Sequence, residues 1–130
     1  MKFLCIYKPA KAEGGLPTPE DMARMGAYIE ENIKSGVLVA SEGCLPSALG
    51  AKVRRSDGKF TVVDGPFSEA KEIVGGLAII NASSKEQAIE ITRSFMTVAG
   101  DGEVEVRQLY EVPACAAARV APVAETVGAR

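Results

Sequence analysis

The chain has 130 residues, of which 47% are hydrophobic and 25% charged, with a formal net charge of −2. These totals are typical of one soluble globular domain and argue against a nucleic-acid partner. No apolar run approaches the roughly 20 residues of a membrane-spanning helix, and residues 1–8 are too short for a signal peptide. We therefore expect a cytoplasmic protein without membrane contact.

Histidine is absent from the chain, and the cysteines are three: Cys5, Cys44 and Cys115. Their odd number and the lack of C-x-x-C spacing argue against a disulfide framework and against a metal site. We expect Cys5 to be buried as a small hydrophobic residue, and we predict no cofactor. Without histidine, acid–base chemistry near neutral pH falls to carboxylates, Lys, Tyr or Cys.

The first predicted strand covers residues 2–8, and its apolar run does not alternate with polar residues, which suggests burial on both faces. A helix is predicted after Thr18, which can cap the first turn ahead of Pro19, and Gly36 ends it. This helix has an apolar stripe at spacings of three and four residues, formed by Met22, Met25, Ile29 and Ile33.

Residues 37–42 are predicted as a second strand, and residues 52–63 as a hairpin around the turn at Asp57-Gly58. Residues 77–80 form another apolar strand without alternation. Ser84 and Gln87 then have the spacing of a capping box that opens a second helix. Residues 103–107 alternate and predict a final, half-exposed strand.

This order of elements predicts an α+β fold: a ferredoxin-like sandwich with an inserted β-hairpin and both helices on one face of the sheet. Two helices cover one face only, yet the strands at 3–7 and 77–80 are apolar on both faces. The simplest cover for the second face is another copy of the chain, so we predict a homodimer packed through the sheet face around a cleft. Residues 1–112 would form the domain, and residues 113–130 an Ala/Val/Pro-rich C-terminal tail.

The join between two apolar runs is unusually rich in turn formers and charges, which is a functional hint. It reads Asp64-Gly65-Pro66-Phe67-Ser68-Glu69-Ala70-Lys71-Glu72, followed by Gly75-Gly76. This stretch resembles the signature of the DGPF proteins within the YCII-related superfamily. The resemblance extends over residues 2–110 and includes Tyr7, Glu42-Gly43, Leu45-Pro46 and residues 103–107.

The resemblance implies a dimeric α/β barrel with an active site in a cleft on the sheet. Some members of the superfamily have a His and Asp pair in that cleft, and at least one branch catalyses dehydrochlorination of an aromatic ring. Here Asp64 is present and the histidine is missing. DGPF proteins are also often encoded beside extracytoplasmic-function sigma factors, which suggests a regulatory setting.

Three residues are candidates for proton transfer: Asp64, Glu42 and Lys71. Substrate contacts are predicted for Tyr7, Leu45, Pro46, Phe67, Glu69, Glu72 and Arg107. For Asp64 the alternative is a side chain that caps its own turn, and for Tyr7 a core tyrosine with one satisfied hydrogen bond. Arg107 can either anchor an anionic ligand or pair with glutamates on its own strand, and the charges at 69–72 can simply be surface charges.

Two functions remain open. One is a cofactor-free enzyme that performs acid–base chemistry on a small organic molecule in a dimer cleft. The other is a non-catalytic, dimeric metabolite-binding or regulatory module, linked to an extracytoplasmic-function sigma factor. Substitution of Asp64 distinguishes them, because an enzyme would lose turnover while retaining binding.

Overall fold

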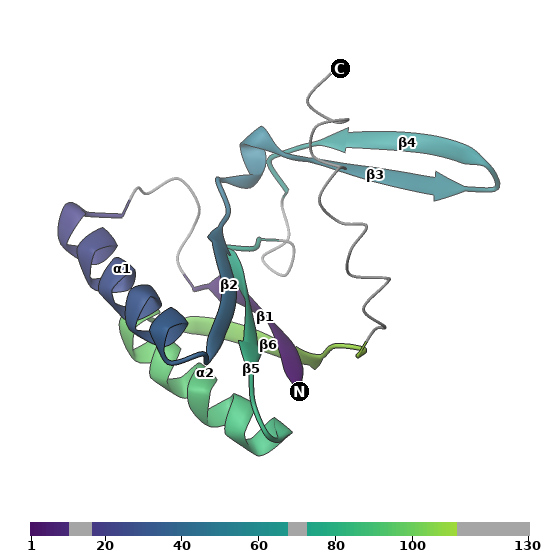
Figure 1. Cartoon of the computed structure of the whole chain (residues 1–130). Helices are drawn as coiled ribbons and strands as arrows, with labels where there is room; N and C mark the ends of the chain where they lie inside the picture. Colours follow the sequence, from purple (N-terminus) through teal and green to yellow (C-terminus); the bar gives the residue numbers. More distant parts are fainter. Residues whose placement is uncertain (11–16, 68–72, 112–130) are drawn as a thin grey trace.

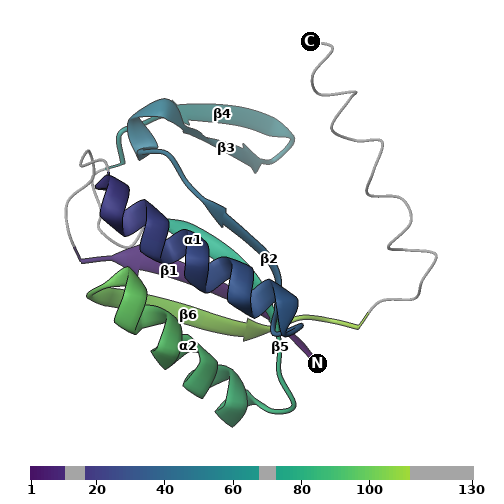
Figure 2. The same ribbon diagram turned by 60° about the vertical axis from the view of Figure 1, so that its left-hand side comes forward.

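A computed structural model of the chain describes residues 1–10, 17–67 and 73–111. Its main sheet contains β1 (Lys2–Pro9), β2 (Leu38–Gly43), β5 (Gly76–Asn81) and β6 (Gly102–Gln108). The strands lie in the order β2-β5-β1-β6, and each neighbouring pair is antiparallel. Helices α1 (Pro19–Lys34) and α2 (Lys85–Ala99) both lie on the same face of this sheet (Figures 1 and 2).

The predicted α+β class is confirmed, and the strand order is compatible with a ferredoxin-like fold. The inserted hairpin consists of β3 (Ala51–Ser56) and β4 (Lys59–Asp64), which form a separate two-stranded sheet. Asp57 and Gly58 both have positive φ, at 52° and 77°, as a two-residue hairpin turn requires. A short 3-10 helix, η1 (Ser47–Leu49), precedes the hairpin, between the segments predicted as the second strand and the hairpin.

Both helix starts agree with their predicted caps. Thr18 Oγ1 accepts a 3.1 Å hydrogen bond from the backbone N–H of Asp21, and Ser84 Oγ accepts one of 3.1 Å from that of Gln87. Gln87 Oε1 in turn accepts from the backbone N–H of Ser83 at 2.6 Å. These local bonds satisfy N–H groups that have no partner inside the helix.

The core lies between the sheet and the two helices. Its buried residues are Phe3, Cys5, Leu38, Ile80, Ala82 and Ala88. Cys5 is buried as predicted, with its Sγ 3.9 Å from Thr92 Oγ1 on α2, and burial raises the pKa of its thiol. Cys5 therefore packs in the core as a protonated thiol.

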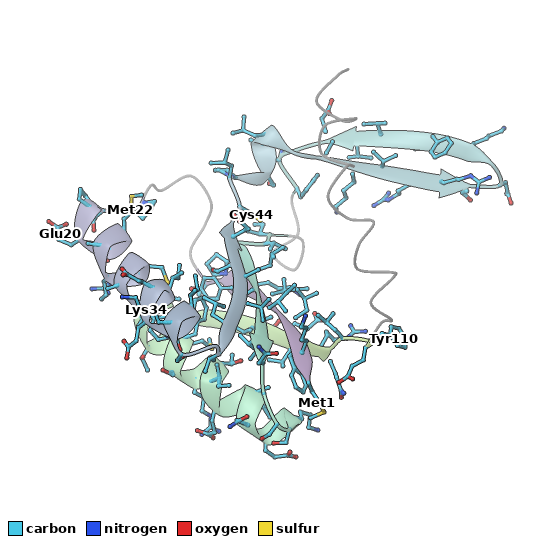
Figure 3. The ribbon with its side chains drawn as sticks, in the orientation of Figure 1. Met1, Glu20, Met22, Lys34, Cys44 and Tyr110 are labelled. Atoms are coloured by element: carbon cyan, nitrogen blue, oxygen red, sulfur yellow. The ribbon has the colours of Figure 1, made fainter. Side chains whose placement is uncertain are left out.

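The apolar stripe of α1 is a partial correction to the sequence analysis, because no residue of α1 is buried. Ile29 packs against the core, but Met22 and Ile33 are 62% and 52% exposed. Figure 3 places Met22 near the end of α1 that lies far from the strands. Helical periodicity predicted the apolar stripe correctly. How many residues of the stripe the sheet covers depends on how the helix is placed against it.

The hairpin leaves the end of the main sheet and projects on the side away from the helices (Figures 1 and 2). All six residues of β4 are exposed. In β3, Lys52 is half-buried and the other residues are exposed. None of the described helices is long and apolar enough to cross a membrane.

Candidate functional site

The sheet face opposite the helices has an apolar centre. Phe3 and Cys5 are buried on the helix side, and side chains alternate along a strand, so Leu4 and Ile6 point to the opposite face. The register pairs Leu4 with Ile79 and Ile6 with Leu77 on β5. These four residues, Leu4, Ile6, Leu77 and Ile79, are called the apolar patch below.

Charged residues flank the apolar patch on strands β1 and β6. Lys8 Nζ lies 3.4 Å from Glu105 Oε1, and Arg107 Nη1 lies 2.9 Å from Glu105 Oε2. The hydrogen bond from Arg107 lowers the pKa of the Glu105 carboxyl, and Lys8 lowers it further. The sequence analysis offered Arg107 two roles, and the structure shows it paired with a glutamate of its own strand. Glu42 is exposed on β2, the opposite edge strand.

Tyr7 lies on the helix side of the sheet. Its hydroxyl is within hydrogen-bond distance of three backbone carbonyls, those of Ala99 at 3.3 Å, Gly100 at 3.4 Å and Asp101 at 3.1 Å. Its ring packs edge to face on Phe95, with centroids 5.6 Å apart. Burial raises the pKa of Tyr7, and the charge of Asp101 raises it further. Tyr7 is half-buried, and its hydroxyl is used within the chain to hold the end of α2.

Gly75 and Gly76 bring the ends of three strands together. The backbone N–H of Gly75 donates to the carbonyl of Tyr7 at 2.8 Å, and its own carbonyl accepts from the N–H of Cys44 at 2.9 Å. A Cβ on Gly76 would lie 2.9 Å from the carbonyl oxygen of Glu42, closer than real Cβ contacts allow. The glycine pair thus permits the close approach of β1, β2 and β5 at one end of the sheet, called the signature end below.

The described part of the signature turn, Asp64-Gly65-Pro66-Phe67, is held against η1. The N–H of Gly65 donates to the carbonyl of Gly50 at 3.0 Å, and the N–H of Phe67 donates to Ser47 Oγ at 3.1 Å. A Cβ built on Gly65 would overlap the carbonyl oxygen of Ser47, so only glycine fits there. The turn therefore fixes the base of the hairpin, with Asp64 exposed at the end of β4.

The structure gathers part of the predicted site around η1. Leu45 is exposed and Pro46 half-buried just before η1, while Phe67 lies after the turn with Lys52 Nζ 4.5 Å from its ring centroid. Arg107 belongs to the far edge strand, and Tyr7 faces the helices. Three further predicted site residues lie outside the described part of the chain: Glu69, Lys71 and Glu72.

The sequence analysis predicted an apolar second face of the sheet, but it missed Lys8 as a member of the same surface. The signal was present, because Leu4, Ile6 and Lys8 share the same parity along β1 and must share a face.

Two shallow hollows in the described part of the chain lie at the other end of the sheet, one of them lined by Met1, Gln108 and Tyr110. Figure 3 shows Met1 and Tyr110 far from Cys44, which lies at the signature end.

Fold and surface together define a small α+β protein whose antiparallel sheet is covered by helices on one face and carries an apolar patch with charged neighbours on the other. The family model of the YCII-related domain matches residues 1–113, so the chain belongs to the YCII-related family. This match confirms the YCII-related family that the resemblance in the sequence indicated.

A comparison with curated proteins found similarity to an uncharacterized protein of Rhizobium meliloti (strain 1021). The two are 30% identical over 89 residues, which cover 68% of this chain and 72% of that protein. Neither the family description nor the name of this relative states an activity.

Proposed function

We propose that the protein works as a homodimer that binds a small organic molecule in a cleft on its sheet and performs acid–base chemistry on it without a cofactor. One observation carries the proposal: the sheet face opposite the helices presents the apolar patch close to charged side chains. Small-molecule sites combine an apolar lining with a few polar groups in this way.

A second copy placed on this face would convert an open surface into an enclosed cleft. Burial of apolar surface stabilises association by about 25 cal/mol per Å², and Leu77 alone is 39% exposed in the single chain. Two sheets packed face to face in this manner would form the dimeric α/β barrel that the family resemblance implies.

Within this cleft we assign proton transfer to Asp64 and Glu42, assisted by Lys71. Asp64 lies beside the turn fixed on η1, and Glu42 lies where β2 meets Gly76 at the signature end. Carboxylates suit this role in a chain that has no histidine.

The non-catalytic alternative is favoured by a different observation. Tyr7 and Arg107, two of the predicted substrate contacts, already have partners within the chain. A site with fewer free reactive groups fits a metabolite-binding or regulatory module, for which a setting beside an extracytoplasmic-function sigma factor is the proposed context.

The test starts with a panel of small aromatic and aliphatic carboxylic acids, added to protein labelled at its Leu and Ile methyl groups. We expect NMR shift changes at Leu77 and Ile79, and loss of substrate signals with time when a compound is turned over. In Asp64→Asn, binding should persist while turnover falls about 100-fold or more, since general acid–base catalysis contributes that much.

Asp57→Asn is the matched control, because Asn tolerates the positive φ of this turn residue. It should change neither binding nor turnover. Binding without turnover in the unmodified protein would support the regulatory alternative. Failure of every compound to shift the patch methyls would contradict a ligand site on this face.

A further inference from the structure

The β3–β4 hairpin has two chemically different faces. The register pairs Val53 with Val62 and Arg55 with Phe60, so these four side chains share one face. The large apolar residues on it, Val53, Phe60 and Val62, are 66%, 69% and 61% exposed. They are called the apolar face of the hairpin below. The other face carries Lys52, Arg54, Ser56, Lys59, Thr61 and Val63.

An isolated two-stranded hairpin is only marginally stable in water. Here the two strands pair with each other and with no strand of the main sheet. The hydrogen bonds of Gly65 and Phe67 fix the base of the hairpin. Arg55 lies over the Phe60 ring, 5.8 Å from its centroid, yet Val53, Phe60 and Val62 all remain more than half exposed in the described part of the chain. An exposed stripe of this kind marks an interaction surface.

The position of the hairpin identifies what can reach it. Figures 1 and 2 show that it projects on the side of the sheet away from the helices, which is the side of the apolar patch. A second copy that covers the patch would therefore occupy the space beside the hairpin. With six residues per strand the hairpin is about 20 Å long. Four strands place the outer strand axes about 14 Å apart, so the hairpin can span the width of a sheet.

Charge also favours a second copy as the partner. The hairpin has four cations, Lys52, Arg54, Arg55 and Lys59, and two acids, Asp57 and Asp64, which give it a formal charge of +2. The whole chain carries −2, so the rest of it carries −4. The arm and the rest of the chain therefore carry opposite formal charges, which favours their association when two copies meet.

We propose that the β3–β4 hairpin is a dimerisation arm that packs its apolar face on the body of a second copy. This inference rests on the homodimer of the proposed function and adds to it a second contact surface. Two-fold symmetry makes the contact reciprocal, so each copy lays its arm on the other. Each arm then closes one side of the cleft formed by the paired sheets.

The experiment is a measurement of the dimer dissociation constant by sedimentation velocity. Val62→Asp places a charge on the apolar face, whereas Thr61→Asp places the same charge on the neighbouring residue of the other face. We expect Val62→Asp to raise the dissociation constant at least tenfold and Thr61→Asp to leave it within about twofold. A second variant, Phe60→Ser, should weaken the dimer without adding a charge. Far-UV circular dichroism checks that each variant keeps the main sheet and helices.

Leu77→Asp separates this inference from the proposed function. If Leu77→Asp dissociates the dimer while Val62→Asp and Phe60→Ser leave it intact, the proposed role of the arm is wrong and the sheet interface stands. If Thr61→Asp dissociates it as strongly as Val62→Asp, the apolar face is not the contact and the arm is again wrong. If the unmodified protein is monomeric at high micromolar concentration, the arm and the proposed homodimer fall together.

Discussion

Single glycines explain why the signature turn has its particular composition. Gly65 lies against the carbonyl of Ser47, and Gly76 against that of Glu42, at separations that leave no room for a Cβ. The glycines therefore serve close backbone approach, and the turn that carries Asp64 is held by backbone contacts to η1. Part of the signature is explained by structure alone, before any chemistry is assigned to its charged residues.

We predict that Gly65→Ala lowers the free energy of unfolding by about 1–3 kcal/mol, the usual cost of forcing an extra carbon into a packed site. Gly26→Ala is the control, because a Cβ at Gly26 on α1 meets nothing within 4 Å. That substitution should raise the free energy of unfolding by about 0.5–1 kcal/mol, since Ala is the better helix former. Urea denaturation measures both, and a Gly65→Ala protein as stable as the unmodified one would contradict the close approach.

Among the elements, the two helices differ in how they are held. Helix α2 contributes buried Ala88 and Thr92, whereas α1 contributes no buried residue. Each helix begins after a capping residue, and its capping bond joins groups only three positions apart in the chain. Such caps follow from the local sequence, which is why both helix starts were predicted correctly. Packing of the helix faces depends on distant residues and was predicted less well for α1.

We predict that Ser84→Ala lowers the free energy of unfolding by about 1 kcal/mol, because the N–H of Gln87 loses its acceptor. Ser83→Ala, one position earlier, keeps the backbone N–H that donates to Gln87 Oε1 and should have little effect. Thermal unfolding of the two variants provides the comparison. Equal destabilisation by both would mean that the cap bond does not support α2.

The whole molecule joins a packed body to an arm that lacks cover within the described residues. The body buries Phe3 and Ala88 between sheet and helices, while every residue of β4 is exposed. Local stability therefore varies along the chain, and the hairpin is one of its less stable parts.

We predict that amide hydrogen exchange in β3 and β4 slows as protein concentration rises, because the proposed dimer covers the hairpin. Exchange of the central strand β1 should be unaffected, since both of its neighbours belong to the same chain. Exchange followed by mass spectrometry at two concentrations tests this. Concentration-independent exchange of Thr61 and Val62 would contradict coverage of the arm.

By itself the sequence determined where the described strands and the two α-helices lie, where both α-helices begin, and that the hairpin turns at Asp57-Gly58, but not the 3-10 helix η1. These features depend on capping, periodicity and turn geometry, which act over a few neighbouring residues. The family could also be recognised, because the signature turn is contiguous in the chain.

Only the tertiary structure decided which candidate residues meet. It turned Tyr7 toward α2 and brought both Lys8 and Arg107 to Glu105. It also separated the hairpin from the main sheet and left its apolar face open. The physical reason is that strand order and the choice of face depend on contacts between residues far apart in the chain, which local patterns do not encode.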